Sequence, residues 1–144
     1  MNGNALSVLY LSAADRARIA GWAEQGYPLE SCGVLIGRQE DGRCWVQEVR
    51  LGRNLNRERA HDRYELAPED LLAADQAASA AGLEIVGIWH SHPDHPARPS
   101  ETDRAHAWSG WSYVIVAVER GRAVDLRSWR LQGETFAEEE LWQP

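Results

Sequence analysis

Two histidines and one carboxylate stand near one another in the middle of the sequence, and all three are metal-binding residue types. His90 and His92 end an apolar run that begins at Ile85, and Asp103 follows within one loop and one helical turn. Residues two apart on a strand point to the same face, about 6.5–7 Å apart along the chain. Two imidazoles placed in this way can converge on one zinc ion, with Zn–N bonds of about 2.0–2.1 Å. The spacing therefore indicates a metal site at the end of a buried strand.

Two interpretations remain open for these residues taken alone. A same-face histidine pair fits a metal site and surface histidines about equally well. Pro93, Pro96 and Pro99 stiffen the loop that follows, as expected where ligands must be held in place. Ser100 and Asp103 also form an S-x-x-[DE] pattern, which is typical of a capping box at a helix start. A serine hydroxyl engaged in such a cap is less free to face a substrate.

The chemistry of such a set is metal-assisted amide hydrolysis. Two histidines and one carboxylate leave the fourth position of a tetrahedral zinc ion to water, which is the arrangement of a catalytic site. Zinc lowers the pKa of that water and polarises a carbonyl. A glutamate could carry the water's proton to the leaving amine, and a hydroxyl could stabilise the oxyanion. Composition and periodicity do not distinguish Glu30 from Glu24 or Glu48 as that glutamate. Three further histidines are expected to be solvated, namely His61, His95 and His106.

The segments that must position these residues alternate between strands and helices. Ser12 can cap a helix over residues 13–25, and Pro68 suits the first turn of a second helix that ends at Gly82. A third, short helix is expected over residues 100–108. The order predicts one α/β domain over residues 1–144, a mixed β-sheet flanked by helices. The expected strands are 7–11, 32–37, 45–51, a short one at 63–66, 84–90, 112–119, 123–131 and, as an edge strand, 134–142.

Charge and composition limit the class of protein. The net charge of −7 argues against a nucleic-acid partner, which needs a basic footprint. Every one of the 15 basic residues is arginine. The longest apolar runs are too short to span a bilayer, and the first residues lack the features of a secretory signal. Cys32 and Cys44 are not spaced as a C-x-x-C motif, and a reduced, cytoplasmic setting is expected, with Cys32 as a core residue.

Taken together, the candidate residues carry a resemblance to the JAMM, or MPN-plus, metalloprotease family. The family motif is a glutamate, a variable gap, H-[ST]-H-P, six residues, a serine, two residues and an aspartate. This sequence has Glu30, HSHP at 90–93, six residues at 94–99, then Ser100 and Asp103. Every spacing matches, and a match of this many residues is far more specific than the histidine pair alone.

The resemblance implies a role for each residue of the motif. One Zn²⁺ per chain would be held by His90, His92 and Asp103. Glu30 would act as general acid/base and activate a zinc-bound water. Ser100 would supply the hydroxyl on the oxyanion side. These roles are carried over from the family and do not follow from the periodicity of this chain.

The resemblance covers nearly the whole chain. Segments 27–37, 64–70, 82–88 and 113–116 are similar to the short prokaryotic members of the family. It implies a single-domain, cytidine-deaminase-like JAMM/MPN fold. The deaminase signature itself, H-x-E with P-C-x-x-C, is absent from the sequence, so base deamination is not expected.

The short prokaryotic members that the chain resembles process ubiquitin-fold sulfur-carrier proteins that end in Gly-Gly. They trim residues beyond the diglycine or release an amino acid such as cysteine. We expect an extended tail to add beside an exposed strand, and the loop from Arg53 to Arg63 could contact an acidic carrier face. The resemblance also allows a homodimer. The alternatives are a general deconjugating isopeptidase or other zinc amidohydrolase on a different substrate, and a non-catalytic MPN binding scaffold, which the intact motif disfavours.

Overall fold

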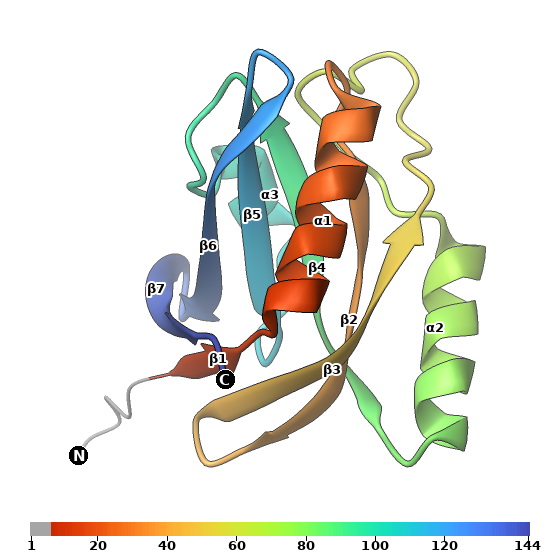
Figure 1. Ribbon diagram of the computed structural model, residues 1–144, viewed down its shortest axis with the longest axis vertical. Helices are drawn as coiled ribbons and strands as arrows, with labels where there is room; N and C mark the ends of the chain where they lie inside the picture. Colours follow the sequence, from red (N-terminus) through yellow and green to blue (C-terminus); the bar gives the residue numbers. More distant parts are fainter. Residues whose placement is uncertain (1–6) are drawn as a thin grey trace.

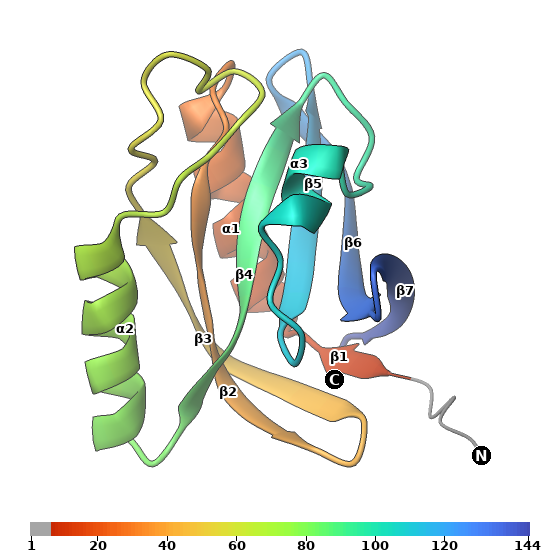
Figure 2. The same cartoon turned by 180° about the vertical axis from the view of Figure 1, so that it is seen from behind.

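The computed structural model describes residues 7–144 and is built on one mixed β-sheet with helices on both faces (Figures 1 and 2). The order of elements is the alternation expected from the sequence, apart from the short strand at 63–66. The elements are β1 (Val8–Tyr10), α1 (Ala13–Gly26), β2 (Cys32–Glu40), β3 (Arg43–Gly52), α2 (Pro68–Ala80), β4 (Glu84–Pro93), α3 (Glu101–Ala105), β5 (Ser112–Glu119), β6 (Arg122–Gln132) and β7 (Thr135–Trp142).

The sheet closes on itself in the order β1-β3-β2-β4-β5-β6-β7. The short β1 strand closes it, because β1 pairs in parallel with both β3 and β7. The other neighbours are antiparallel except β4 and β5, which are parallel and are connected through α3. The expectation of an edge strand over residues 134–142 is therefore wrong. Closure pairs the backbone groups that an edge strand would leave open.

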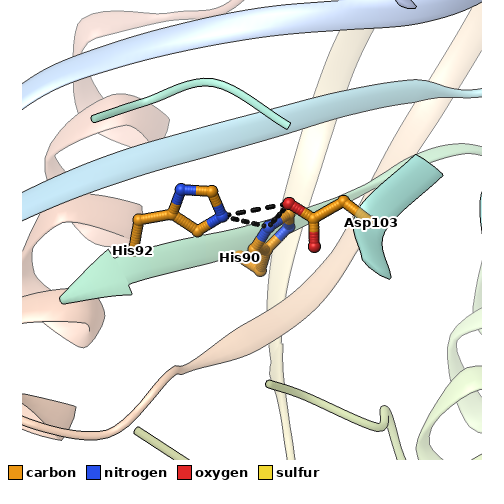
Figure 3. A group of neighbouring side chains, drawn as sticks. All are labelled: His90, His92 and Asp103. Atoms are coloured by element: carbon orange, nitrogen blue, oxygen red, sulfur yellow. Dashed lines mark hydrogen bonds and ion pairs between the residues drawn. The ribbon is translucent and has the colours of Figure 1, made fainter. Parts of the chain in front are cut away.

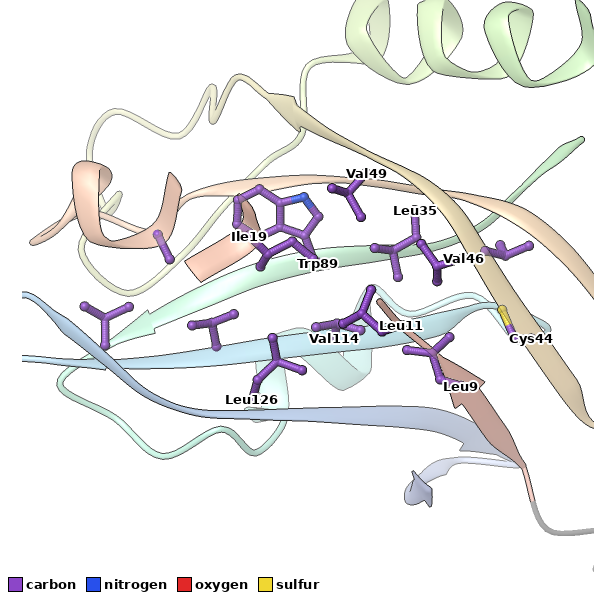
Figure 4. Packing of buried hydrophobic residues seen from close by; sticks show 14 residues of the cluster. Leu9, Leu11, Ile19, Leu35, Cys44, Val46, Val49, Trp89, Val114 and Leu126 are labelled. Carbon is purple, nitrogen blue, oxygen red and sulfur yellow. The ribbon is translucent and has the colours of Figure 1, made fainter. Parts of the chain in front are cut away.

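The two faces of the sheet carry different helices, and the pleat of each strand divides its side chains between them. On β2, Leu35 packs on one side with Ile19 of α1, whereas Val34 packs on the other with Ala74 and Ala78 of α2. Figure 4 shows the first of these clusters, in which Trp89 lies beside Ile19. The small alanines of α2 allow this helix to pack closely on the sheet. Neither α1 nor α2, nor any other helix within residues 7–144, has the length and hydrophobicity needed to cross a membrane.

Local signals set most of the element boundaries. Ser12 Oγ accepts a hydrogen bond of 3.1 Å from the Asp15 amide, which confirms the predicted helix cap. Asp41 and Gly42 have φ angles of 51° and 77°, the left-handed conformations that a two-residue hairpin turn requires. β4 continues to Pro93, so His92 lies within the strand and not in the loop after it.

Two expected elements differ in the structure. Residues 63–66 form no strand; Leu66 makes only an isolated antiparallel bridge with Asn54, because α2 begins immediately afterwards at Pro68. The third helix is shorter than expected and ends at Ala105.

A close approach of three strands fixes the backbone beneath the site. The Trp89 indole N–H donates a 3.0 Å hydrogen bond to the Arg50 carbonyl across Gly33. A Cβ at Gly33 would lie 1.9 Å from that carbonyl oxygen and 2.3 Å from the indole nitrogen, so no side chain fits there. Glycine therefore lets Trp89 pack directly against β2, and Trp89 precedes His90 on the strand.

Candidate functional site

His90, His92 and Asp103 converge on one point at the end of β4, on the face of the sheet that carries α2 and α3 (Figure 3). His90 Nε2 and His92 Nε2 are 3.1 Å apart, and Asp103 Oδ2 lies 3.2 Å from the first and 3.0 Å from the second. All three side chains are largely shielded, with exposed fractions of 1%, 7% and 10%. The structure therefore brings together the three residues that the sequence singled out as metal ligands.

The donor set fits a divalent metal ion. Donors bound tetrahedrally at about 2.0–2.1 Å lie about 3.3–3.4 Å from one another, close to the separations here. Two imidazole nitrogens and a carboxylate are also the ligand types of catalytic zinc sites. The three atoms form a group able to hold a metal ion.

The imidazole of His92 is held in the tautomer that a metal ligand needs. Its Nδ1 lies 2.7 Å from the Pro96 carbonyl oxygen. Because a carbonyl only accepts, Nδ1 carries the proton and Nε2 presents its lone pair to the site. The loop after β4 thus orients a ligand through its backbone. His90 differs, since its buried Nδ1 has no hydrogen-bond partner within residues 7–144.

Asp103 is positioned by the first turn of α3. Its Oδ2 accepts a 2.9 Å hydrogen bond from the Ser100 amide, and Ser100 Oγ accepts a 3.0 Å bond from the Asp103 amide. This is the capping box that the sequence predicts. Burial alone would raise the pKa of Asp103, but the neighbouring His90 charge and the hydrogen bonds from both histidines and the Ser100 amide hold that pKa well below its usual range.

The register of β2 against β4 places Glu30 beside the histidines. Cys32 pairs with His90, and the pairing continues outward because the Ser91 amide donates a 3.0 Å bond to the Ser31 carbonyl. Ser91 Oγ accepts a further bond of 2.8 Å from the Ser31 amide. The next residue along this register is Glu30, opposite His92. Two residues that are 62 positions apart in sequence are thereby neighbours in space.

Glu30 is buried and has an unusual carboxyl group. The residue is only 6% exposed, and its Oε1 has no hydrogen-bond partner within residues 7–144. Burial raises the pKa of Glu30 to about 8, against smaller opposing effects from His92 and Arg63. A carboxyl with a pKa near neutrality can both accept and return a proton, which suits a general acid/base.

Asn54 connects the loop after β3 to the site and carried no signal in the sequence. Its Nδ2 donates to the Glu30 carbonyl at 3.0 Å and to the Arg63 carbonyl at 3.1 Å. Its Oδ1 accepts from the amides of Asn56 and Glu65, both at 2.9 Å. The Glu30 amide in turn donates to a carbonyl of the same loop. Residues 53–66, which include the polar and irregular stretch 54–62 expected to be a mobile surface loop, are thus bonded to the backbone of Glu30.

Tyr64 is a second neighbour of the site that the sequence did not single out. Its ring stacks on the His90 imidazole, with centroids 4.5 Å apart and an interplanar angle of 25°. No local pattern marks this contact, because it depends on the path of the loop across the end of β4. In Figure 2 this loop and α3 lie on either side of that strand end.

Two cavities flank the convergence point. The first, of about 590 Å³, is here called the aromatic groove and includes Asp103 in its wall. Its apolar lining is Tyr64, Leu66, Leu71, Ile88, Trp108, Trp111 and Tyr113. The second, of about 510 Å³, is here called the arginine cavity. It is lined by Glu30, Asp62, Arg63, His92, His95, Pro96, Arg98, Ser100 and Thr102. Arg63 and Thr102 line both cavities, so the two are neighbours, with Asp103 in the wall of the first and His92 in the wall of the second.

The remaining candidates of the sequence analysis lie where they were expected. His61, His95 and His106 are exposed, although His95 lines the arginine cavity. Cys32 is fully buried, and burial raises the pKa of its thiol to about 12, so it is a core residue and not a nucleophile.

Comparison with known proteins gives a consistent result. The family described as prokaryotic homologs of the JAB domain matches residues 12–132. A desampylase from Haloferax volcanii is 36% identical over 116 residues, which are 76% of this chain and 80% of that protein. A CysO-cysteine peptidase from Mycobacterium tuberculosis is 32% identical over 81% of this chain and 78% of its own length. A probable TtuB-protein conjugate cleaving protease from Thermus thermophilus is 34% identical over 67% of this chain and 61% of its own.

Solved structures agree at the level of the fold. A solution structure from Desulfitobacterium hafniense superimposes with a TM-score of 0.82 at 28% identity, over 96% of this chain and 93% of that one. A JAB1/MPN domain protein from Archaeoglobus fulgidus gives a TM-score of 0.56 at 18% identity, over 98% of this chain and 100% of that one. The resemblance first carried by Glu30 and the HSHP run at 90–93 is thereby confirmed: the chain belongs to the prokaryotic JAB-domain family and is an enzyme, a hydrolase of the JAMM type.

Proposed function

We propose that this protein is a zinc-dependent peptidase that hydrolyses the peptide or isopeptide bond after the C-terminal Gly-Gly of a ubiquitin-like sulfur-carrier protein. The observation that carries the proposal is the convergence of His90, His92 and Asp103 on one point, with the buried Glu30 in the wall of the cavity that His92 also lines. The peptidases and conjugate-cleaving proteases among its relatives support the substrate class. One Zn²⁺ per chain would be held by the two histidines and the aspartate.

Zinc, when bound, would polarise the scissile carbonyl and acidify the attacking water. The other steps are carried out by side chains of this chain. Glu30 takes the proton from the attacking water and delivers it to the leaving amine. A lone pair of Ser100 Oγ accepts the hydrogen bond from the Asp103 amide. The hydroxyl hydrogen of Ser100 is therefore still available to donate to the carbonyl oxygen of the substrate. The capping role and the oxyanion role of Ser100 are therefore compatible.

The two cavities receive opposite ends of the substrate. Glu30 lines the arginine cavity, and the group that protonates the leaving amine must lie beside that amine. The leaving group is therefore placed in the arginine cavity and the acyl tail of the carrier in the aromatic groove. The scissile bond would lie between the two cavities, beside Asp103. The diglycine suits this passage, because glycines bring no side chain past the metal ligands.

The aromatic groove offers backbone groups that can pair with an extended tail. Hydrogen bonds from the Leu55 amide to the Glu65 carbonyl and from the Ala67 amide to the Arg53 carbonyl flank the bridge at Leu66. Alternate residues of an extended segment point opposite ways, so the backbone groups of Tyr64 and Leu66 face away from that pairing. No backbone group within residues 7–144 bonds to them. A tail added here would pair by strand addition, as peptide ligands of many binding domains do.

The test is hydrolysis by the Glu30→Gln variant loaded with zinc. The substrate is a ubiquitin-fold carrier with residues beyond its Gly-Gly end, and mass spectrometry follows the product. Loss of the general acid/base should lower kcat by a factor on the order of 10²–10⁴, while zinc content measured by metal analysis stays at one per chain. Glu58→Gln is the control, because Glu58 is exposed and lies outside both cavities. Undiminished processing by zinc-loaded Glu30→Gln would refute the mechanism.

The alternative of a general deconjugating isopeptidase uses the same residues and differs only in what occupies the arginine cavity. We include a cytoplasmic setting in the proposal, because Cys32 and Cys44 are free and buried.

A further inference from the structure

The arginine cavity holds two cationic side chains without partners in the same wall as the buried Glu30. Arg53 is paired with Glu69 and Asp70, and Arg59 is paired with Asp62. By contrast, the guanidinium groups of Arg63 and Arg98 have no ion pair or hydrogen bond within residues 7–144. The two unpaired guanidinium groups face the same cavity as Glu30.

The acidic groups of this cavity do not neutralise these cations. Asp62 is paired with Arg59, and its Oδ1 also lies 3.7 Å from His61 Nε2. Glu30 is buried and serves the proton transfers of the proposed reaction. The cavity thus presents two free guanidinium groups, with the imidazole of His95 beside them. Guanidinium groups form strong, directional hydrogen bonds with carboxylates.

We propose that the arginine cavity binds the free α-carboxylate of the leaving residue, with Arg98 and Arg63 as its specificity-determining side chains. The enzyme then removes a single terminal amino acid from the diglycine end of its carrier in preference to a lysine side chain of a conjugated protein. This inference rests on the proposed function and narrows its substrate class.

Chemical connectivity supports the placement. In an amino-acid leaving group, the α-carboxylate lies only two bonds from the nitrogen that Glu30 must protonate, so both groups occupy one cavity. An isopeptide leaving group instead places the methylenes of a lysine there, with no anion to meet the arginines. The balance of the reaction is simple: water adds across the amide, the acyl carbon gains its oxygen, and the amine leaves with the proton from Glu30.

The test compares two substrates that differ only in the terminal charge. One is a ubiquitin-fold carrier ending in Gly-Gly-Ala with a free carboxylate, and the other ends in Gly-Gly-alaninamide. Loss of a charge-assisted contact of about 1.5–3 kcal/mol predicts that kcat/KM favours the free acid by roughly 10- to 100-fold. Calorimetric binding of the peptides Gly-Gly-Ala and Gly-Gly-alaninamide to the zinc-loaded Glu30→Gln variant gives a second measurement without turnover, with the acid expected to bind about tenfold tighter.

Three variants locate the contact. Arg98→Gln should lower kcat/KM for the free-acid substrate about tenfold and change kcat/KM for the amide substrate by less than about twofold. The preference for the acid over the amide is then lost. Arg63→Gln should act in the same direction, and the acid-to-amide ratio cancels any effect of Arg63 on the pKa of Glu30. Arg16→Gln is the matched control, because Arg16 is an exposed residue of α1 outside both cavities and should leave both rates unchanged.

The outcomes separate this inference from the function on which it rests. Equal hydrolysis of acid and amide by the wild type overturns the inference and leaves the peptidase proposal intact. An equal fall for both substrates in Arg98→Gln also overturns it, since the arginine then binds the carrier body. If neither substrate is cleaved by zinc-loaded enzyme, the proposed function itself fails. A preference for the acid that disappears in Arg98→Gln and persists in Arg16→Gln supports the inference.

Discussion

Asp103 meets two requirements with one carboxylate oxygen. Oδ2 faces both histidine Nε2 atoms and also accepts the Ser100 amide of the helix cap. The first turn of α3 therefore orients the Asp103 carboxylate before a metal ion binds. Less side-chain conformational entropy is then lost when the ion binds. Similarly, the Pro96 carbonyl fixes the tautomer of His92. At the scale of single residues, the site is preorganised by backbone groups next to its ligands.

Glu30 gives a pH-dependent prediction for the metal-free protein. Its pKa is about 8 in the fold and 4.5 in the unfolded chain, so the folded state disfavours the ionised form. This cost is absent below pH 4.5, grows as pH rises and is complete above about pH 8. Glu30→Gln should therefore gain stability relative to wild type across that interval, by roughly 3–5 kcal/mol. Urea unfolding with a chelator present, between pH 4.5 and 8.5, measures the difference. If the free energy of unfolding of Glu30→Gln differed from that of the wild type by the same amount at every pH, the expected burial of the charge would be contradicted. Such a pH-independent difference is expected only for the control variant Glu58→Gln.

The motif residues could be predicted from the sequence, because their spacing along β4 and α3 is local. Glu30 could not be distinguished from other glutamates without the family resemblance, since its place beside His92 comes from the long-range register of β2 and β4. Asn54 and Tyr64 could not be predicted, because their contacts with the site depend on how residues 53–66 cross the end of the sheet.

At the scale of elements, the segment 53–66 forms a wall shared by the two cavities. Arg63 lines both of them, and Tyr64 packs on a metal-binding histidine. Hydrophobic alternation and turn signals predicted the neighbouring strands and helices well. For this segment they predicted only a short strand over residues 63–66, which is wrong, because the segment is held by side-chain hydrogen bonds from Asn54 in place of a regular ladder.

Asn54→Ala is expected to loosen this segment without unfolding the sheet. The change removes four hydrogen bonds to backbone groups, each contributing about 0.5–1.5 kcal/mol. Amide hydrogen exchange at Asn56 and Glu65 should become at least about tenfold faster, and kcat/KM on a carrier substrate should fall about tenfold. Arg57→Ala, an exposed change in the same segment, should leave exchange as it is. Unaltered exchange in Asn54→Ala would show that other contacts hold the segment.

At the scale of the whole molecule, metal binding and folding should be coupled. The ligands come from β4 and α3, so a bound ion links the sheet to a five-residue helix that is too short to be stable alone.

Single-domain status over 1–144 remains a prediction of the sequence. The closure of the sheet could not be predicted from the sequence, because nothing in residues 7–11 indicates a strand that pairs with two neighbouring strands.

Removal of zinc should lower the thermal stability of the protein. An ion that binds only the native state at about 1,000 times its Kd stabilises it by about 4 kcal/mol, equivalent to a Tm rise of about 10 °C. Differential scanning fluorimetry with a chelator, followed by added zinc, measures the shift. His92→Ala should abolish it, whereas His61→Ala, at an exposed histidine, should retain it. A full shift in His92→Ala would place the stabilising ion elsewhere.

The closed sheet has a consequence for how the protein behaves at high concentration. Open strand edges recruit other chains and are a common route to fibrils and swapped dimers. Here β1 seals both β3 and β7, so the sheet has no terminal strand to extend within residues 7–144. Under the proposed function, an extended tail would pair only with the brief backbone edge at Tyr64 and Leu66, which is long enough for a short tail and too short to template polymerisation.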